Sequence, residues 1–268
     1  MCSGIDPHDN ADTLGKFIAQ AASGKAEILF TPEMTGLIDR DRSRASQHIC
    51  FEQDDAVLAA ARAGAAKANM WISLGSLAVK SDDLMQEKWI NRSFLIDPNG
   101  EIKARYDKIH LFDVDLDTGE SWRESNAYAG GKRAVLAPFA NAKLGLSICY
   151  DVRFSALYKA LSDAGADILS IPAAFTVPTG KAHWEILLRA RAIESASFVV
   201  AAAQCGEHQD GRKTFGHSMV VDPWGKILLD MDAEIGVGFC DIDLDEVQEV
   251  RKRVPVISNR RDFENPGP

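Results

Sequence analysis

The sequence predicts an α/β fold of two similar halves, in which helices cover the outer faces of sheets. Two pairs of segments recur in the same order along the chain, and helical patterns lie between them. The chain has 268 residues, of which 46% are hydrophobic, and this is enough for one large domain with an extensive core. We therefore predict a single domain over residues 1–268, with a C-terminal tail from about residue 245 that begins as a short charged helix and continues as extended chain.

The first repeated segment is a short strand that ends at a proline. Residues 26–33 (AEILFTPE) resemble residues 166–173 (ADILSIPA), and each segment follows a helix end that contains glycine. The short apolar run predicts a buried strand, and the proline ends it because proline lacks the N–H that a sheet needs. The two segments are thus equivalent strands of the two halves.

The second repeated segment is a hairpin. Residues 93–102 (SFLIDPNGEI) resemble residues 218–227 (SMVVDPWGKI), and each has a D-P-x-G sequence between two apolar runs. Proline and glycine supply the backbone geometry of a tight turn, so each segment predicts two antiparallel strands. One such pair could arise by chance, but two pairs in the same order indicate a duplicated architecture.

The predicted helices and one further strand lie between these segments. Apolar residues recur three or four positions apart in each helical stretch, which is the spacing of one helix face. The helices cover residues 10–22, 57–68, 153–163 and 184–192, and a buried strand follows at residues 197–204.

The comparison of the two halves also predicts that one strand is missing from the first half. In the second half a strand at residues 143–149 precedes the helix at residues 153–163. In the first half only the nine residues MCSGIDPHD precede the corresponding helix. Either the sequence begins late and the first edge strand is truncated, or the fold lacks this strand. We favour the late start, because an uncovered sheet edge invites unwanted pairing.

Charge and cysteine content exclude several classes of partner. The net charge is −9 and no basic patch stands out, so neither nucleic acid nor a membrane surface is an expected partner. No apolar run is long enough to span a bilayer. The five cysteines and six histidines show no zinc-ligand spacing, so we expect no metal and no cofactor. An odd number of scattered cysteines without a secretory signal predicts a cytoplasmic protein.

Cys149 lies at a predicted strand-to-helix junction. Apolar residues alternate from Leu144 to Ile148, as in a strand, and recur at helical spacing from Phe154 to Leu161. The positive end of a helix dipole favours a thiolate over a thiol, so Cys149 is a candidate nucleophile. The alternative is a buried and unreactive cysteine.

A cysteine needs a base and an oxyanion donor before it can cleave an amide. Glu33 ends a predicted strand and would lie near Cys149 if the strands are parallel neighbours, since polar groups gather at the carboxyl ends of such strands. The alternative is a solvated loop glutamate. Lys108 occupies a polar position in a strand-like run, and this pattern alone favours a surface lysine.

The arrangement of these three residues resembles the nitrilase superfamily of carbon–nitrogen hydrolases, over essentially the whole chain. The resemblance is carried by FTPE around Glu33, YDKIHLFDVD around Lys108 and SICYDVRFSALY around Cys149. The order Glu, Lys, Cys is the catalytic triad of that family. The segment RESNAYAGG resembles the one that supplies a second glutamate, here Glu124. The resemblance implies a four-layer αββα sandwich that pairs into a homodimer.

The resemblance also implies a mechanism. Cys149 attacks the amide carbonyl while Glu33 accepts its proton, and Lys108 with the backbone N–H of Tyr150 holds the oxyanion. Glu33 protonates the leaving amine and then activates water to hydrolyse the thioester. Glu124 positions Lys108 and the substrate amide, unless it is only an ion-pair partner of Lys108.

Within the superfamily, CYDVRF, HWEILLRARAIE, VVAAAQCGEH and GHSMVVDPWG resemble the deaminated-glutathione amidases, with the ω-amidases next. Both groups imply a small-molecule amide next to an α-keto acid carboxylate. Arg153 is then the expected carboxylate ligand, because guanidinium binds carboxylate bidentately. The alternative for Arg153 is a helix-surface salt bridge. Ala174 and Phe175 are expected to line the substrate pocket.

Three other functions remain open from the sequence. The protein could be an ω-amidase that acts on 2-oxoglutaramate or 2-oxosuccinamate, or it could accept N-carbamoyl compounds. It could also be a non-catalytic interaction protein on a retained scaffold, although a scaffold has no need of an activated thiol.

Overall fold

The chain forms two facing sheets, which a computed structural model describes for residues 1–83, 85, 87–115, 119 and 121–267. The strands of the first sheet are β1 (Ile28–Phe30), β2 (Trp71–Val79), β3 (Trp89–Ile96) and β4 (Ile102–Asp107), with β7 (Tyr128–Ala129) added to β3. The strands of the second sheet are, in spatial order, β15 (Ile227–Asp230), β14 (Met219–Val221), β11 (Phe198–Ala201), β10 (Ile168–Ser170), β9 (Ala142–Leu146) and β8 (Val135–Phe139).

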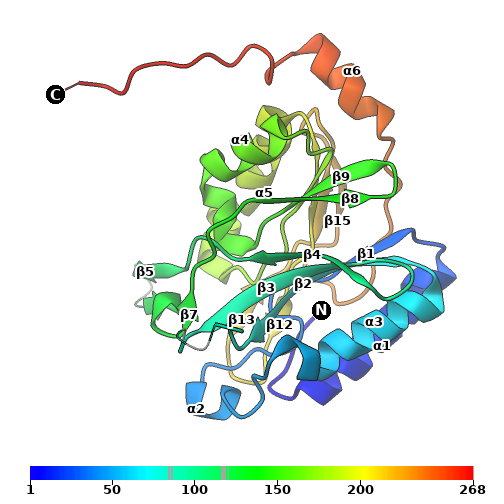
Figure 1. Cartoon of the computed structure of the whole chain (residues 1–268), viewed down its shortest axis with the longest axis vertical. Coiled ribbons are helices and arrows are strands. Elements are labelled where there is room, and N and C mark those ends of the chain that lie inside the picture. The colour runs from blue at the N-terminus through cyan, green and yellow to red at the C-terminus, as the bar shows by residue number, and fades with distance from the viewer. Residues whose placement is uncertain (84, 86, 116–118, 120, 268) are drawn as a thin grey trace.

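A pair of helices covers the outer face of each sheet. α1 (Pro7–Ser23) and α3 (Ala56–Ala68) pack on the first sheet, and α4 (Ser155–Asp163) and α5 (Val177–Ser195) pack on the second. Figure 1 shows α1 and α3 at the lower right and α4 and α5 at the upper left, with the strands between them. The layers run helix, sheet, sheet, helix, which confirms the predicted αββα sandwich.

The inner faces of the two sheets share one hydrophobic core. The rings of Trp71 and Phe139 meet edge to face, with centroids 5.5 Å apart. Ser73 Oγ lies 3.4 Å from Ser170 Oγ across the same interface. Tyr106 on β4 is fully buried among apolar residues of the second sheet. The two halves are therefore held together by contacts between their sheets.

Aspartate caps fix the starts of the first-half helices. The Asp6 carboxylate accepts a hydrogen bond from the His8 backbone N–H at 2.8 Å, and Pro7 follows it as the first residue of α1. Asp55 caps α3 in the same way through the Leu58 N–H, at 2.8 Å. α1 thus begins three residues before the predicted residue 10, because its first turn is defined by the cap and not by the apolar stripe.

Both predicted hairpins are present, and their turns have the same construction. β3 and β4 are antiparallel, as are β14 and β15. The Asp97 carboxylate accepts two backbone N–H groups of its turn at 2.9 Å, and Asp222 does so at 2.9 and 2.8 Å. Gly100 and Gly225 have φ values of 78° and 88°, a region that glycine adopts without strain. The D-P-x-G sequence therefore predicts both turns correctly.

The strand before Cys149 is shorter than predicted. β9 ends at Leu146, and Cys149 begins a 3-10 helix, η3 (Cys149–Arg153), rather than α4. The chain still runs beside β10 after Leu146, because the Cys149 N–H donates to the Pro172 carbonyl at 2.8 Å. The strand predicted at residues 197–204 is likewise shorter, since β11 ends at residue 201.

β1 lies at the edge of its sheet, as the repeat predicts. β10 pairs in parallel with β9 on one side and β11 on the other. In the described part of the chain β1 pairs only with β2. The first residues instead contact the second half, where the Met1 carbonyl accepts from the Cys205 N–H at 2.9 Å.

Several short elements surround the sandwich and were not predicted, apart from the C-terminal helix. They are α2 (Arg42–Ala45), η1 (Glu52–Asp54), β5 (Asp113–Asp115), β6 (Ser121–Arg123), η2 (Glu124–Asn126), β12 (Cys205–Glu207), β13 (Lys213–Phe215) and α6 (Asp245–Arg253). After α6 the chain passes the ends of α4 and α5, where Arg260 donates to the Ser162 hydroxyl at 3.0 Å and the Glu194 carbonyl at 3.1 Å, and its last residues then extend away from the sandwich (Figure 1). Within the described residues, no helix combines the length and the apolar character needed to cross a membrane.

Candidate active site

A pocket of about 490 Å³ opens where the two halves meet, and it brings together almost all the predicted site residues. Strands β3 and β7 of the first sheet line it, together with the segments that follow β9 and β10 of the second sheet, the β5–β6 ribbon and the β12–β13 hairpin. The predicted site residues in its lining are Glu33, Lys108, Glu124, Cys149, Tyr150, Ala174 and Phe175. Arg153 is not among the residues that line the pocket.

Cys149 sits on a tight and strongly held turn. It is buried and has a φ of 50°, a left-handed conformation that is costly for a residue with a side chain. Asp151, two residues on, is fully buried and accepts hydrogen bonds from the Ile148 N–H at 2.9 Å and the Tyr106 hydroxyl at 2.6 Å. His110 adds its backbone N–H at 3.0 Å. These bonds hold the strained turn that presents Cys149.

Glu33 follows β1 and is almost completely buried. Its Oε1 accepts hydrogen bonds from Lys108 Nζ at 2.8 Å and Asn91 Nδ2 at 2.9 Å, and its Oε2 accepts from the Ala174 N–H at 3.0 Å. Burial alone would raise the pKa of Glu33, but the Lys108 charge and hydrogen bonds from Lys108, Cys149 and Asn91 lower it. The carboxylate is therefore ionised beside the thiol.

Lys108 follows β4 and is 2% exposed, so the surface position that its sequence pattern favours is wrong. Its Nζ also donates to Glu124, at 3.1 Å to Oε1 and 2.9 Å to Oε2. Burial opposes its charge, but Glu124 and Glu33 outweigh burial and raise the pKa of Lys108 well above its usual value. The site thus holds a fixed ammonium between two carboxylates.

The thiol of Cys149 is protonated in this environment. Burial, and then the negative charge of Glu33, raise its pKa well above the ordinary value for cysteine. The expectation of a thiolate stabilised by a helix N-terminus is therefore wrong. The physical reason is that Cys149 opens only a short 3-10 helix, while α4 begins six residues later. Such a thiol needs a base at the moment of attack, and Glu33 is adjacent.

Two residues of the site were missed from the sequence. Asn91 on β3 is buried and donates to both glutamates, to Glu33 at 2.9 Å and to Glu124 at 3.3 Å. Its signal is the polar run Asn91–Ser93 between the apolar ends of the strand WINRSFLI. Asp151, which holds the Cys149 turn, is the second, and its signal is a carboxylate next to a buried strand end.

Glu124 is held in place independently of Lys108. Its Oε2 accepts a hydrogen bond from the Phe112 N–H at 2.7 Å. With the bonds from Lys108 and Asn91, this orients the carboxylate toward the pocket, which it lines. Among the described residues, no group accepts a hydrogen bond from the Tyr150 backbone N–H, so this donor is available beside Cys149.

The predicted substrate residues differ in their placement. Ala174 lines the pocket and positions Glu33 through its N–H. Phe175 also lines the pocket and packs on Trp184, with the ring centroids 4.7 Å apart. Arg153 Nη1 lies 3.2 Å from His183 Nδ1, and its guanidinium lies over the ring of Phe175 at 5.4 Å. The carboxylate-binding role of Arg153 stays a prediction.

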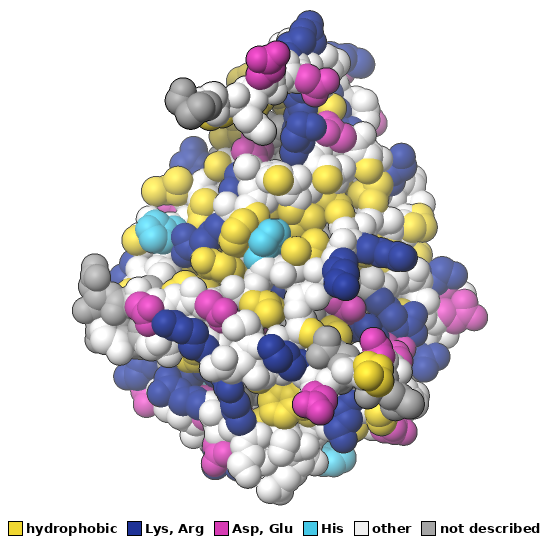
Figure 2. Space-filling view, turned by 60° about the vertical axis from the view of Figure 1, so that its left-hand side comes forward, with side chains coloured by type: hydrophobic (Ala, Val, Ile, Leu, Met, Phe, Trp, Pro, Cys, Tyr) yellow, Lys and Arg dark blue, Asp and Glu magenta, His cyan; other side chains and the backbone are white. Residues whose placement is uncertain are grey.

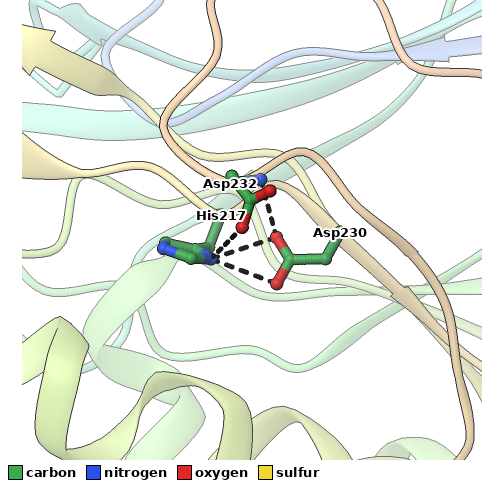
Figure 3. Close-up of side chains that lie close together, drawn as sticks. All are labelled: His217, Asp230 and Asp232. Carbon is green, nitrogen blue, oxygen red and sulfur yellow. Dashed lines mark hydrogen bonds and ion pairs between the residues drawn. The ribbon is translucent and has the colours of Figure 1, made fainter.

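One cluster of possible metal ligands lies outside the pocket, among the described residues. His217 Nδ1 is 3.1 Å from both carboxylate oxygens of Asp230, and Asp232 lies beside them (Figure 3). Both aspartates are partly or fully exposed to solvent. Exposed ion pairs of this kind form without a metal, so the cluster assigns none.

Comparison with known proteins agrees with this geometry. The carbon–nitrogen hydrolase family matches residues 3–252. This chain belongs to the carbon–nitrogen hydrolase family. Relatives include a protein named deaminated glutathione amidase from Yersinia enterocolitica, 39% identical over 97% of this chain and 91% of that protein. The predicted class of enzyme, a cysteine-dependent hydrolase of amides, is confirmed by the family and its amidase members.

Two solved structures confirm the family's fold in this chain. The NitFhit protein of Caenorhabditis elegans has a TM-score of 0.89 and 38% identity, and the match covers 97% of this chain and 63% of that one. An amidase from Nesterenkonia sp. AN1, described with acrylamide added at its active-site cysteine, has a TM-score of 0.78 and 27% identity. That match covers 95% of each chain. The predicted nitrilase fold is therefore confirmed.

Proposed function

We propose that this chain hydrolyses the amide of a small α-keto acid, with deaminated glutathione as the best-supported substrate, through a thioester on Cys149. The observation that carries the proposal is the convergence of Glu33, Lys108 and Cys149 in one pocket built from both halves. The name of the Yersinia relative supports the choice of substrate.

In the first half-reaction, Cys149 attacks the carbonyl carbon while Glu33 takes the thiol proton. The pKa of Cys149 is raised and that of Glu33 is lowered, so the transfer is uphill until the oxyanion forms. In this mechanism the Lys108 ammonium and the Tyr150 N–H stabilise that oxyanion, a contribution typically of about 10²–10³ in rate for each donor. Glu33 then returns the proton to the departing amine.

In the second half-reaction, Glu33 removes a proton from water, which attacks the thioester and releases the keto acid, and Glu33 returns this proton to the departing Cys149 sulfur. Lys108 has to remain charged throughout, and the Glu124 carboxylate keeps its pKa high and its position fixed. The Asn91 amide donates to both Glu33 and Glu124 and so fixes the position of one carboxylate relative to the other. The chain's own residues therefore supply the nucleophile, the base and the oxyanion donors of the two proposed steps.

We further propose that the chain folds as one domain with a C-terminal tail, that two copies form a homodimer, and that the protein is cytoplasmic. Ile186 and Ile193 of α5 are both exposed, and because they are seven positions apart they lie on one face of the helix. Ile193 contacts Gly225, and the neighbouring residue Trp224 is also exposed. The face of the molecule shown in Figure 2 carries hydrophobic side chains grouped in its upper half. An apolar helix face of this kind suits pairing with a second copy. The free state of all five cysteines supports a reducing compartment.

The test of the function is a comparison of substrates. We expect release of 2-oxoglutarate from deaminated glutathione, no turnover by Cys149→Ala, and an unchanged thermal melt for that variant. A strong preference for 2-oxoglutaramate would move the protein to the ω-amidases. Activity on neither amide, with Cys149→Ala and the unmodified protein indistinguishable on a wider amide panel, would contradict the proposal.

A further inference from the structure

Arg212 is a cationic side chain of the pocket whose hydrogen-bond donors are unused. It lies at the end of the turn between β12 and β13, lines the pocket and is 19% exposed. Within the described residues its guanidinium donates no hydrogen bond, and Nε is buried without a partner. The nearest carboxylate oxygen is Asp210 Oδ2, 3.8 Å from Nε and beyond hydrogen-bond distance. Leaving such donors unpaired is costly, so the site is suited to an acceptor from outside the chain.

The position of Arg212 is nevertheless fixed. Its guanidinium lies over the ring of Trp122, 4.7 Å from the centroid, and Arg40 lies 5.7 Å from the same ring. Asp210 accepts the backbone N–H groups of Arg40 at 2.9 Å and Arg212 at 2.8 Å, which ties the turn to the chain after β1. A guanidinium held in this way loses little entropy when it binds a ligand.

The other basic side chains near the pocket already have acceptors or lie at its rim. Arg42 donates to the Arg123 carbonyl at 2.8 Å, and Arg123 forms a two-pronged pair with Asp115. Lys213 pairs with Glu207 at 3.1 Å. Arg40 is about half exposed, and Lys108 is held by its two glutamates. Among the described residues that line the pocket, Arg212 is thus the largely buried cation whose hydrogen-bond donors have no acceptor.

The positive charge of Arg212 acts on another residue of the pocket lining. Burial raises the pKa of Tyr128, and the charge of Arg212 opposes this rise. The chain as a whole carries a net charge of −9, so an anionic substrate needs a local positive charge to enter. A guanidinium matches the two oxygens of a carboxylate.

We propose that Arg212, stacked on Trp122, binds a carboxylate of the substrate and so sets the preference for keto acid amides over neutral ones. This inference rests on the proposed function, because it assigns the carboxylate ligand of that substrate class. Deaminated glutathione offers a carboxylate on the keto acid part and another on the leaving peptide. 2-Oxoglutaramate offers only the former.

The test measures kcat/KM for deaminated glutathione, 2-oxoglutaramate and pentanamide, a neutral amide of the same chain length. The proteins are the unmodified chain, Arg212→Gln, Arg212→Lys, Arg153→Gln and, as the matched control, Arg253→Gln on α6, whose side chain is 68% exposed. Arg212→Gln should lose about 10- to 100-fold on the carboxylated amides, mainly through KM, and far less on pentanamide. Arg212→Lys should fall between.

The outcomes distinguish a failure of the Arg212 assignment from a failure of the proposed amidase function. Loss with both carboxylated amides supports the inference and places Arg212 on the keto acid carboxylate. Loss with deaminated glutathione alone overturns it, because Arg212 would then bind the leaving peptide and could not set the preference for keto acid amides. An equal loss on pentanamide, or a selective loss in Arg153→Gln but not Arg212→Gln, overturns the inference while leaving the amidase intact.

A binding measurement keeps the inference testable if neither keto acid amide turns over. 2-Oxoglutarate should protect Cys149 of the unmodified chain against iodoacetamide, and Arg212→Gln should need about 10-fold more for the same protection. Equal protection of the two proteins, or none of either, overturns the assignment of Arg212. Thermal melts of the variants exclude misfolding as the cause of a loss.

Discussion

At the scale of single residues, Glu33 has two opposite effects on Cys149. Its negative charge holds the proton on the thiol, yet its carboxylate is the only base that contacts that thiol among the described residues. Lys108 acts in the other direction, since its positive charge lowers the pKa of Cys149. In the proposed mechanism, Cys149 is therefore a thiol in the resting site and loses its proton to Glu33 when a carbonyl is bound.

The first prediction follows from these signs. In Glu33→Gln the charge that raises the pKa of Cys149 is gone while Lys108 remains, so the thiol should ionise at lower pH. Turnover should nevertheless fall by about 10² or more, because the general base is lost. Alkylation by iodoacetamide across a pH series measures the first effect and an amide assay the second. Glu185→Gln, an exposed residue of α5, is the control. An alkylation midpoint that stays or rises in Glu33→Gln would contradict this account.

The sequence predicts the triad residues but not all of their surroundings. Glu33 and Cys149 follow strands whose apolar patterns are local, so their neighbourhood could be inferred. Lys108 becomes a buried residue only through contacts with Glu33 and Glu124, which are 75 and 16 positions away. Residue pattern alone therefore favours the surface for Lys108, and only the family resemblance points to the pocket.

At the scale of elements, local turn chemistry decides what can be predicted. Both D-P-x-G hairpins are predicted because an aspartate, a proline and a glycine define the turn within five residues. The β12–β13 hairpin was missed although its turn is also local, since the Gly211 N–H donates to the His208 carbonyl at 2.8 Å. Its two strands have only three residues each, which is too short for an alternating apolar pattern to indicate a strand.

The second prediction belongs to the scale of elements and concerns the exposed face of α5. Ile193 is about half exposed and contacts Gly225. If this face forms the dimer, Ile193→Glu places charges in an apolar interface and should convert the protein largely to monomer. Sedimentation velocity at several concentrations measures the state, with Glu185→Gln on the same helix as the control. A dimer of unchanged affinity in Ile193→Glu would exclude this face.

At the scale of the whole molecule, the active site depends on the packing of the two halves. The first half contributes Glu33, Asn91 and Lys108, and the second contributes Cys149 and the N–H of Ala174. Each half resembles the other in sequence, but their catalytic residues differ. The internal repeat therefore predicts the αββα frame, whereas it cannot indicate which side chains meet between the halves.

The central claim is that turnover proceeds through a thioester on Cys149. The most direct measurement is intact-protein mass spectrometry of a reaction with deaminated glutathione, quenched in acid within the first turnovers. The account predicts one 2-oxoglutaryl group per chain, mapped to the peptide that contains Cys149 and absent from Cys149→Ala. Turnover by Cys149→Ala at the rate of the unmodified chain, with no adduct on either protein, would contradict it.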